Sequence, residues 1–97
     1  MFYVYMLRCD DNSLYTGYTT DISKRFDAHQ SKDAPAAKYT KSHNVVSLEA
    51  FWELETKSLA LRLEARIKKL TKAKKEELIS NPDLINSYIN ELLTPLK

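Results

Sequence analysis

The sequence has one glycine, three prolines and one cysteine among its 97 residues. The lone cysteine, Cys9, excludes an internal disulfide and any cysteine-rich zinc site, and its place in an apolar run predicts a buried, reduced thiol. No apolar run approaches the ~20 residues that a membrane-spanning helix needs. The N-terminus, MFYVYMLRCDD, has no basic leader and reaches acidic residues too early for a signal peptide. These absences predict a soluble cytoplasmic protein.

Length and composition predict one small domain. Of the 97 residues, 43% are hydrophobic and 10% aromatic, which is enough for one core without disulfides or a structural metal. We expect a single domain over residues 1–97, with its core at about 1–80 and a C-terminal helix at about 82–94.

Positive charge is concentrated in one segment, although the net charge is only +2. Residues 57–75 contain a single acid, Glu64, and eight basic side chains: Lys57, Arg62, Arg66, Lys68, Lys69, Lys72, Lys74 and Lys75. A local basic block is typical of a protein that binds a polyanion such as nucleic acid. The alternative is a charged helix face that is only solvated.

The first eighteen residues predict a β-hairpin. FYVYMLR at 2–8 and LYTGY at 14–18 are aromatic, β-branched and apolar, as strands are, and the turn cluster DDNS separates them. A helix should follow, capped by Thr20 or Asp21 and running to about Gln30. Its buried side would carry two apolar residues spaced by one turn, Ile22 and Phe26.

The second half of the chain predicts one strand and three helices. A long polar loop at 31–44 precedes a strand at 45–54, VVSLEAFWEL. From Thr56 the apolar period becomes helical, through Leu59, Leu63, Ile67 and Leu70.

Two further helices should follow this one. Thr71 can cap a helix to about Ile79, and Asn81-Pro82 can start the last helix, at 83–93, with asparagine as cap and proline as first residue. The last helix is apolar on more than one side, which fits deep packing or a dimer contact. The fold class is therefore α+β, a small three-stranded antiparallel sheet flanked by helices in the order β-β-α-β-α-α-α.

Tyrosines recur on the predicted hairpin. Tyr3 and Tyr5 alternate on one face of the first strand, with Val4 on the other face, and Tyr15 follows on the paired strand. Aromatic cross-strand pairs stabilise sheets, so a structural role is the simplest interpretation. The only glycine, Gly17, permits a close approach or a bulge near the strand end, or lets the chain leave the strand toward the helix.

Three charged or titratable residues have a structural and a functional interpretation. Arg25 and His29 are four residues apart, so they share a helix face. That arginine either holds a phosphate or lies at the surface beside a solvated histidine. Glu64 either forms an ordinary surface pair with Lys68, worth ~0.3 kcal/mol, or is an oxygen ligand for a magnesium ion.

The order and spacing of these residues resemble the GIY-YIG nuclease superfamily. Tyr3-Val4-Tyr5 stands at the first motif and Tyr15-Thr16-Gly17 at the second, followed by Arg25, His29 and Glu64. The segments that carry the resemblance are YVYMLRCDDNSLYTGYTTDISKRFDAH, AAKYTK and LALRLEARIKKLTKAKKEELI. More narrowly, the chain is similar to the small stand-alone bacterial proteins of this superfamily.

The resemblance implies a DNA endonuclease that cuts phosphodiester bonds with one divalent metal ion, Mg²⁺ or Mn²⁺. Glu64 would hold the metal, and Arg25 would clamp the scissile phosphate. Either Tyr5 or Tyr15 would orient or deprotonate the attacking water, and His29 would assist that proton transfer or the phosphate contact.

The remaining implied contacts are with substrate, and they come from Gly17, Lys38, Tyr39 and Lys68. DNA, branched or single-stranded forms included, would be the substrate, with repair or recombination as the setting. Target specificity would come from the chain's own basic helix, from a loop or from a partner protein, because the chain has no room for a second DNA-binding domain.

The chain departs from the family pattern at several positions. Tyr3 replaces the glycine of the first motif and brings an aromatic onto the tyrosine-bearing face, Thr16 replaces the isoleucine of the second, and Tyr18 stands where some relatives carry an activating lysine. Asn86 or Asn90 would have to serve as the terminal asparagine of several relatives.

Three other functions stay open on the sequence. One is a nucleic-acid-binding module with the nuclease fold and little turnover. Another is a protein-interaction or structural domain whose basic helix meets an acidic partner. A Cys-His nucleophile enzyme is the weakest, because nothing places Cys9 beside His29 or His43.

Overall fold

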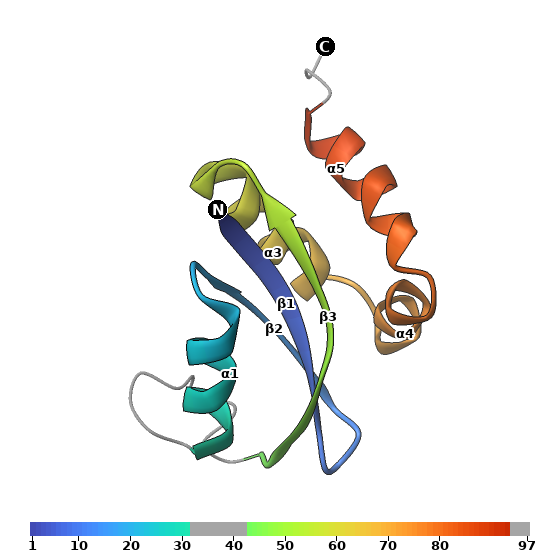
Figure 1. Ribbon diagram of the computed structural model, residues 1–97. Coiled ribbons are helices and arrows are strands. Elements are labelled where there is room, and N and C mark those ends of the chain that lie inside the picture. The colour runs from blue at the N-terminus through green and yellow to red at the C-terminus, as the bar shows by residue number, and fades with distance from the viewer. Residues whose placement is uncertain (32–42, 94–97) are drawn as a thin grey trace.

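A three-stranded antiparallel sheet forms the centre of the structure, a computed structural model that describes residues 1–31 and 43–93 (Figure 1). Strand β1 (Phe2–Cys9) lies in the middle, between β2 (Leu14–Thr19) and β3 (Val45–Leu54). In the registers of the two strand pairs, Tyr5 stands opposite a residue on each neighbour, Gly17 on β2 and Phe51 on β3. The predicted antiparallel sheet is confirmed.

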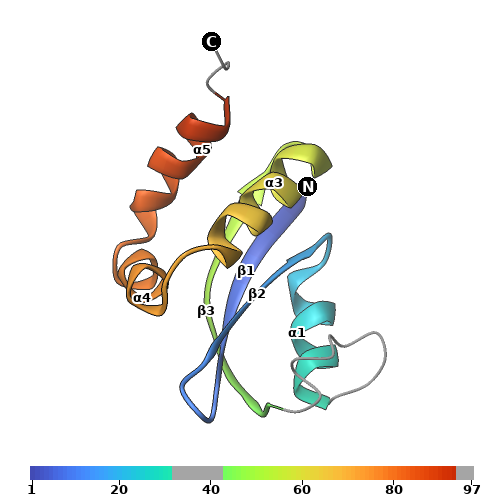
Figure 2. The same cartoon turned by 180° about the vertical axis from the view of Figure 1, so that it is seen from behind.

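The helices follow the predicted order. They are α1 (Ile22–Ser31), α3 (Lys57–Lys68), α4 (Lys72–Ser80) and α5 (Ile85–Leu93). Helix α3 lies on one side of the sheet and α1 on the other, while α4 and α5 extend beyond the β3 side (Figures 1 and 2). The α+β fold class is thus confirmed.

The main hydrophobic core lies between the sheet and α3. Val4 and Met6, on alternate positions of β1, belong to one buried cluster with Leu63 of α3. The other buried members are Leu14, Leu54, Ala60, Ile67, Leu78 and Ile85. The positions on α3 repeat every three or four residues, which is the helical period that the sequence predicted.

The opposite face of β1 is buried as well. Tyr5, Leu7 and Cys9 lie there with at most 2% of their surface exposed, on the side that α1 covers. Because both faces are covered, the middle of β1 reads as a continuous apolar run rather than as an alternating one. Cys9 is a buried thiol outside any disulfide, as predicted.

Side-chain caps begin three of the helices. Asp21 accepts a hydrogen bond from the backbone of Lys24 at 3.1 Å, and Thr56 and Thr71 cap α3 and α4 in the same way. Of the two predicted caps for α1, Asp21 is the one that makes this bond.

The predicted start of the last helix is wrong. Pro82–Leu84 form a short 3-10 turn, the Asn81 side chain makes no capping bond, and α5 begins only at Ile85. The proline sits in the first turn as expected, but the backbone N–H of Leu84 bonds to the carbonyl of Asn81, which gives a 3-10 turn in place of a capped α-helix. Helix α5 packs on α3, with Ile85 buried and Leu93 61% exposed.

Within the described ranges, no helix is both long and apolar enough to cross a membrane.

Candidate active site

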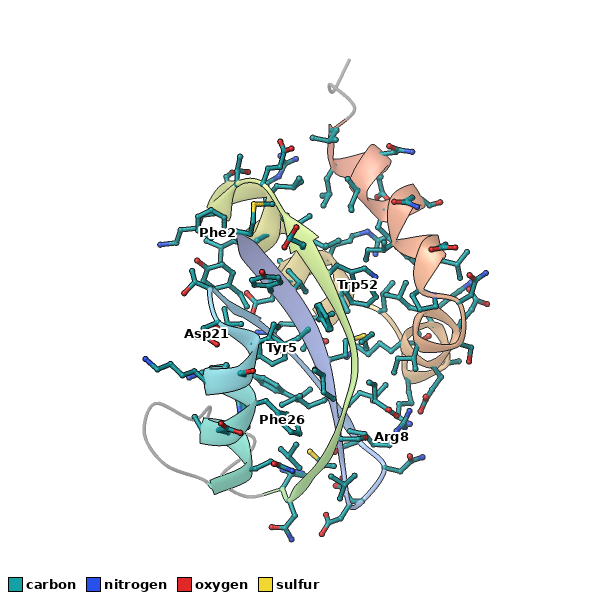
Figure 3. All side chains as sticks on the ribbon, viewed as in Figure 1. Phe2, Tyr5, Arg8, Asp21, Phe26 and Trp52 are labelled. Atoms are coloured by element: carbon teal, nitrogen blue, oxygen red, sulfur yellow. The ribbon has the colours of Figure 1, made fainter. Side chains whose placement is uncertain are left out.

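The site is organised around the hydroxyl of Tyr5. The side chain leaves the middle strand toward β2 and passes over Gly17, where a Cβ atom would collide with the Tyr5 hydroxyl and come within 3.0 Å of the Tyr15 ring. Figure 3 shows Tyr5 and Phe26 in the space between α1 and the sheet. The missing side chain of Gly17 is therefore what lets the Tyr5 hydroxyl reach this position.

Helix α1 supplies two partners for that hydroxyl. Arg25 donates through Nε at 3.3 Å, and His29 Nε2 lies 2.8 Å from the oxygen. The four-residue spacing places both side chains on one helix face, as predicted. The alternative of a solvated histidine is wrong, because His29 is fully buried, whereas the predicted core residues Ile22 and Phe26 are only half-buried.

Tyr15, on the edge strand β2, packs beside Tyr5 and His29. Its ring centroid is 5.2 Å from that of His29 and 6.4 Å from that of Tyr5. Tyr5 and His29 are themselves 5.8 Å apart, so the three rings form a compact cluster. The packing fixes the orientation of each ring, and with it the direction of the Tyr5 hydroxyl.

Helix α3 brings Glu64 and Lys68 to this cluster. Lys68 Nζ lies 3.3 Å from a Glu64 carboxylate oxygen and 5.8 Å from the Tyr15 ring centroid. The charge of Glu64 also contributes to the raised pKa of Tyr5, so the carboxylate lies within electrostatic range of the hydroxyl. The structure thus brings together all five predicted catalytic residues, together with Gly17 and Lys68.

Burial sets the protonation states at the centre. Desolvation raises the pKa of Tyr5 to about 12, against the opposing effect of the Arg25 hydrogen bond. Desolvation first, and the Arg25 charge second, lower the pKa of His29 to about 4. At neutral pH both groups are therefore uncharged, and the Tyr5 oxygen is a hydrogen-bonding group rather than a tyrosinate.

The protein offers few ligands for a metal. Among the described residues, no group of three or more histidine, cysteine, aspartate or glutamate side chains is arranged to hold an ion. The Glu64 carboxylate, with its side chain 18% exposed, is the acid that α3 brings to the cluster. One carboxylate fits Mg²⁺, which commonly takes one or two protein oxygens and fills its other positions with water and substrate phosphate.

The position of Gly17 inside β2 shows that the predicted bulge, or exit of the chain from the strand, is wrong. The residue lies inside β2, with an unbroken register to β1, so it neither forms a bulge nor lets the chain leave the strand. The close approach of Tyr5 is the role that the structure supports.

The side chains at the three positions that depart from the family pattern make their contacts away from the Tyr5 hydroxyl. Tyr3 donates its hydroxyl to Glu53 on β3 at 3.1 Å, on the opposite side of β1 from Gly17. Tyr18 stacks on Phe2 and packs against the core, and Thr16 is buried. No lysine stands at position 18, but Lys68 brings an ammonium group to the Tyr15 ring from α3.

A pocket of about 410 Å³ extends the site along α1 and the end of β2. Its lining is Thr19, Thr20, Asp21, Lys24, Arg25 and Ala28. Sequence reasoning identified Arg25 but not Thr19 or Lys24, although the threonine-rich strand end before a capped helix was a usable signal. A cavity of about 450 Å³ between β3, α3 and α5 contains none of the predicted site residues.

Two predicted substrate contacts, Lys38 and Tyr39, lie outside the described residues, so they stay predictions.

The basic block is not a uniform positive surface. Arg66 pairs with Glu91 and Arg62 donates to the carbonyl of Leu92, so both hold α5 in place. Three lysines pair with acids: Lys68 with Glu64, Lys72 with Glu76, and Lys74 with Glu77. Most of the acids that neutralise the block lie just after it in the chain or on α5, which is why the segment looked almost free of negative charge.

Comparisons with known proteins identify the family of the chain. Residues 1–77 match the family described as "GIY-YIG catalytic domain". The UPF0213 protein FN1575 of Fusobacterium nucleatum is 48% identical over 91 residues, covering 94% of this chain and 86% of that protein. The UPF0213 protein YhbQ of Salmonella typhimurium is 38% identical over 94 residues, 97% of this chain and 92% of that protein.

A solved structure is similar as well. The NMR structure of the UPF0213 protein BH0048 from Bacillus halodurans has 44% identity and a TM-score of 0.53, and the match covers 82% of this chain and 84% of that one. The names of these relatives state no activity.

Proposed function

Because the chain belongs to the GIY-YIG family, we propose that it is a divalent-metal-dependent endonuclease that hydrolyses phosphodiester bonds in DNA. The observation that carries this proposal is the Tyr5 hydroxyl, held at 3.3 Å by Arg25 and at 2.8 Å by His29. Arg25 also lines a pocket of about 410 Å³, and the hydroxyl lies within electrostatic range of one carboxylate, Glu64.

Arg25 is the group that holds the scissile phosphate. Its guanidinium is always charged and has five N–H donors, and the bond to Tyr5 uses Nε. The side chain lines the pocket that opens at Thr19 and Lys24. A phosphate in this pocket would receive charge-assisted hydrogen bonds, which strengthen as charge develops in the transition state.

Tyr5 positions the attacking water and passes on its proton. Arg25 can only donate, so the Tyr5 oxygen accepts from Arg25. In the His29 tautomer protonated at Nδ1, the Tyr5 hydroxyl donates to His29 Nε2. The second lone pair of the oxygen is then directed at a water. As this water attacks the phosphorus, its proton moves to Tyr5 while the Tyr5 proton moves to His29, so no tyrosinate has to form.

Substrate binding itself makes His29 a better proton acceptor. The positive charge of Arg25 is one cause of the lowered pKa of His29, about 4 in the free protein. A phosphate on Arg25 offsets that charge, so the pKa of His29 rises when substrate is bound. The relay is thus weak in the free enzyme and becomes stronger in the complex.

Glu64 would hold the metal ion, Mg²⁺ or Mn²⁺, which supplies Lewis-acid stabilisation of charge on the phosphate oxygens when it is bound. Lys68, paired with Glu64 at 3.3 Å, would turn to a phosphate when the metal takes its place.

A second candidate function is a nucleic-acid-binding protein with the same fold and little turnover. The observation in its favour is the pair of pKa values, about 12 for Tyr5 and about 4 for His29, because neither group accepts a proton readily at neutral pH. This protein would bind DNA through Arg25 and Lys68 without cutting it.

Cleavage assays distinguish the two functions. Single-stranded, duplex and branched DNA are incubated with the protein and Mg²⁺ or Mn²⁺, and with EDTA. We expect metal-dependent cleavage that falls at least ~100-fold in Arg25→Ala, Glu64→Gln and Tyr5→Phe. Tyr18→Phe is the matched control, because it removes a tyrosine hydroxyl on the other face of the sheet.

Binding that persists in all these variants without any cutting would support the binding protein instead. Equal cleavage by Tyr5→Phe and the parent would overturn the role of the hydroxyl. A cytoplasmic location, a partner protein that supplies target specificity, and a role in repair or recombination complete the proposal.

A further inference from the structure

Two aromatic residues form an exposed surface beside the site. Phe51 has 53% of its surface exposed, and the Tyr3 ring meets it edge-on at 6.3 Å between centroids. Phe51 stands opposite Tyr5 in the β1–β3 register, and Tyr3 is two residues before Tyr5 on β1. Cross-strand partners share a sheet face, so all three side chains belong to the face that carries the catalytic hydroxyl.

Phe51 takes no part in the main hydrophobic core, which lies on the opposite face of the sheet. The neighbouring Trp52, on the opposite face of the same strand, packs against the core and donates to the carbonyl of Pro82. An exposed aromatic ring next to a candidate phosphate site is a typical stacking surface for a base.

The aromatic pair lies one strand away from a residue that lines the Arg25 pocket. Tyr3 pairs with Thr19 on β2, and Thr19 lines that pocket. On its other side Tyr3 pairs with Glu53 on β3. Adjacent strands are about 4.8 Å apart, so the path from the pocket to the β3 side is only about 10 Å. A nucleotide next to a phosphate on Arg25 therefore reaches the aromatic pair.

Charge indicates which part of the nucleotide would lie there. The Glu53 carboxylate accepts a hydrogen bond from the Tyr3 hydroxyl. This negative group repels a phosphate, so the strand would place an uncharged base, and not its backbone, over the rings.

We propose that Phe51 and Tyr3 form a stacking platform for an unpaired base adjacent to the scissile phosphate, and that the substrate is therefore nucleic acid with a single-stranded segment. This inference rests on the proposed nuclease function and adds the substrate class. A base inside a duplex is stacked on its neighbours and cannot cover the Phe51 ring without leaving them.

The test is binding to oligonucleotides by a protein that cannot cut. Glu64→Gln serves as the background, and the probes are a single strand with one 2-aminopurine and the corresponding duplex. We expect quenching of 2-aminopurine fluorescence on binding the single strand. Phe51→Ala should lose this quenching and bind the single strand roughly 5- to 150-fold more weakly, with little change for the duplex.

The chain offers a matched control on the same strand. Val46 is 54% exposed, so Val46→Ala removes an apolar side chain of similar exposure, and we expect unchanged binding and quenching. Phe51→Trp should restore both, whereas Phe51→Leu, which is apolar but has no ring, should not.

Three results would overturn the platform. These are unchanged binding by Phe51→Ala, an equal loss in Val46→Ala, and a change of oligomeric state in Phe51→Ala measured by sedimentation, which would assign Phe51 to a contact between copies. Failure of the parent protein to bind or cut any oligonucleotide is a different result, because it does not depend on Phe51 and would overturn the proposed function itself.

Discussion

Gly17 and Tyr5 face each other across the β1–β2 pair, and the Tyr5 hydroxyl occupies the space that a side chain at position 17 would take. Replacement of Gly17 by alanine should therefore displace the Tyr5 ring and break its contacts with Arg25 and His29. We expect Gly17→Ala to cost about 1–3 kcal/mol of unfolding free energy, as overpacking does, and to lose most of the cleavage activity. Urea denaturation and the cleavage assay measure the two effects.

The phenol ring, and not only its hydroxyl, causes this collision. Tyr5 Cζ is also too close to a Cβ at position 17, so Gly17→Ala should remain destabilising when Tyr5 is replaced by phenylalanine. A Gly17→Ala protein as stable and active as the parent would show that Tyr5 does not lie over the strand in this way.

His29 makes the stability of the protein depend on pH. Its pKa is about 4 in the folded protein, against an ordinary value of 6.5, because burial disfavours the charged ring. The unfolded chain therefore binds a proton that the folded protein does not between these values. Stability should fall as the pH drops from about 6.5 toward 4, by up to about 3 kcal/mol from this group.

Comparison with a variant isolates that contribution. His29→Gln keeps a hydrogen-bond acceptor for Tyr5 but does not titrate, so its stability should change less over the same pH range. The lowered pKa of Glu76, about 2 through its bonds to Arg8 and Lys72, affects stability only below about pH 4.5. Equal pH dependence in both proteins between pH 6.5 and 4.5 would contradict the buried, neutral histidine.

Local chemistry made much of the fold predictable. Strand β3 has the predicted bounds, and Thr56 and Thr71 cap their helices, because strand propensity and capping depend on neighbouring residues. The Asn81 side chain makes no capping bond, and Pro82–Leu84 form a 3-10 turn, an outcome that neighbouring sequence does not determine. The division into a core at 1–80 and a C-terminal helix stays a prediction.

Long-range contacts account for what the sequence could not predict at the site. The spacing of Tyr5, Arg25 and His29 indicated a shared surface, but their hydrogen bonds depend on how α1 docks on the sheet. The burial of His29 comes from that docking, since its own segment is polar. In the same way, the ion pair between Arg66 and Glu91 joins residues 25 positions apart, so a window over the basic block missed it.

Thr16 is a site where a substitution should stabilise the protein. It is 2% exposed, and within the described part of the chain its hydroxyl has no hydrogen-bond partner. Valine has the same shape without the buried polar group, so Thr16→Val should gain about 1 kcal/mol of unfolding free energy. Thermal or urea unfolding measures this gain.

The matched control is Thr19→Val on the same strand. The Thr19 hydroxyl oxygen accepts from the backbone of Asp21 at 3.1 Å, so its loss should cost about 0.5–1 kcal/mol. If both variants were destabilised to the same extent, the Thr16 hydroxyl would have to have a partner in solution.

The basic block should divide into structural arginines and DNA-binding lysines. Arg66 lies 5.0 Å over the Tyr88 ring and 3.4 Å from Glu91, so Arg66→Ala should destabilise the docking of α5 by about 1 kcal/mol. Lys69 and Lys75 form no ion pair with another described residue, which leaves them available for phosphates.

DNA binding at several salt concentrations tests this division. A lysine that contacts a duplex phosphate releases a counterion, so each of Lys69→Ala and Lys75→Ala should lower the slope of log Kobs against log salt by about 0.9. Arg66→Ala should leave the slope unchanged while it lowers the unfolding free energy. A reduced slope in Arg66→Ala with unchanged stability would mean that α5 leaves α3 when DNA binds, and that the arginine then contacts phosphate.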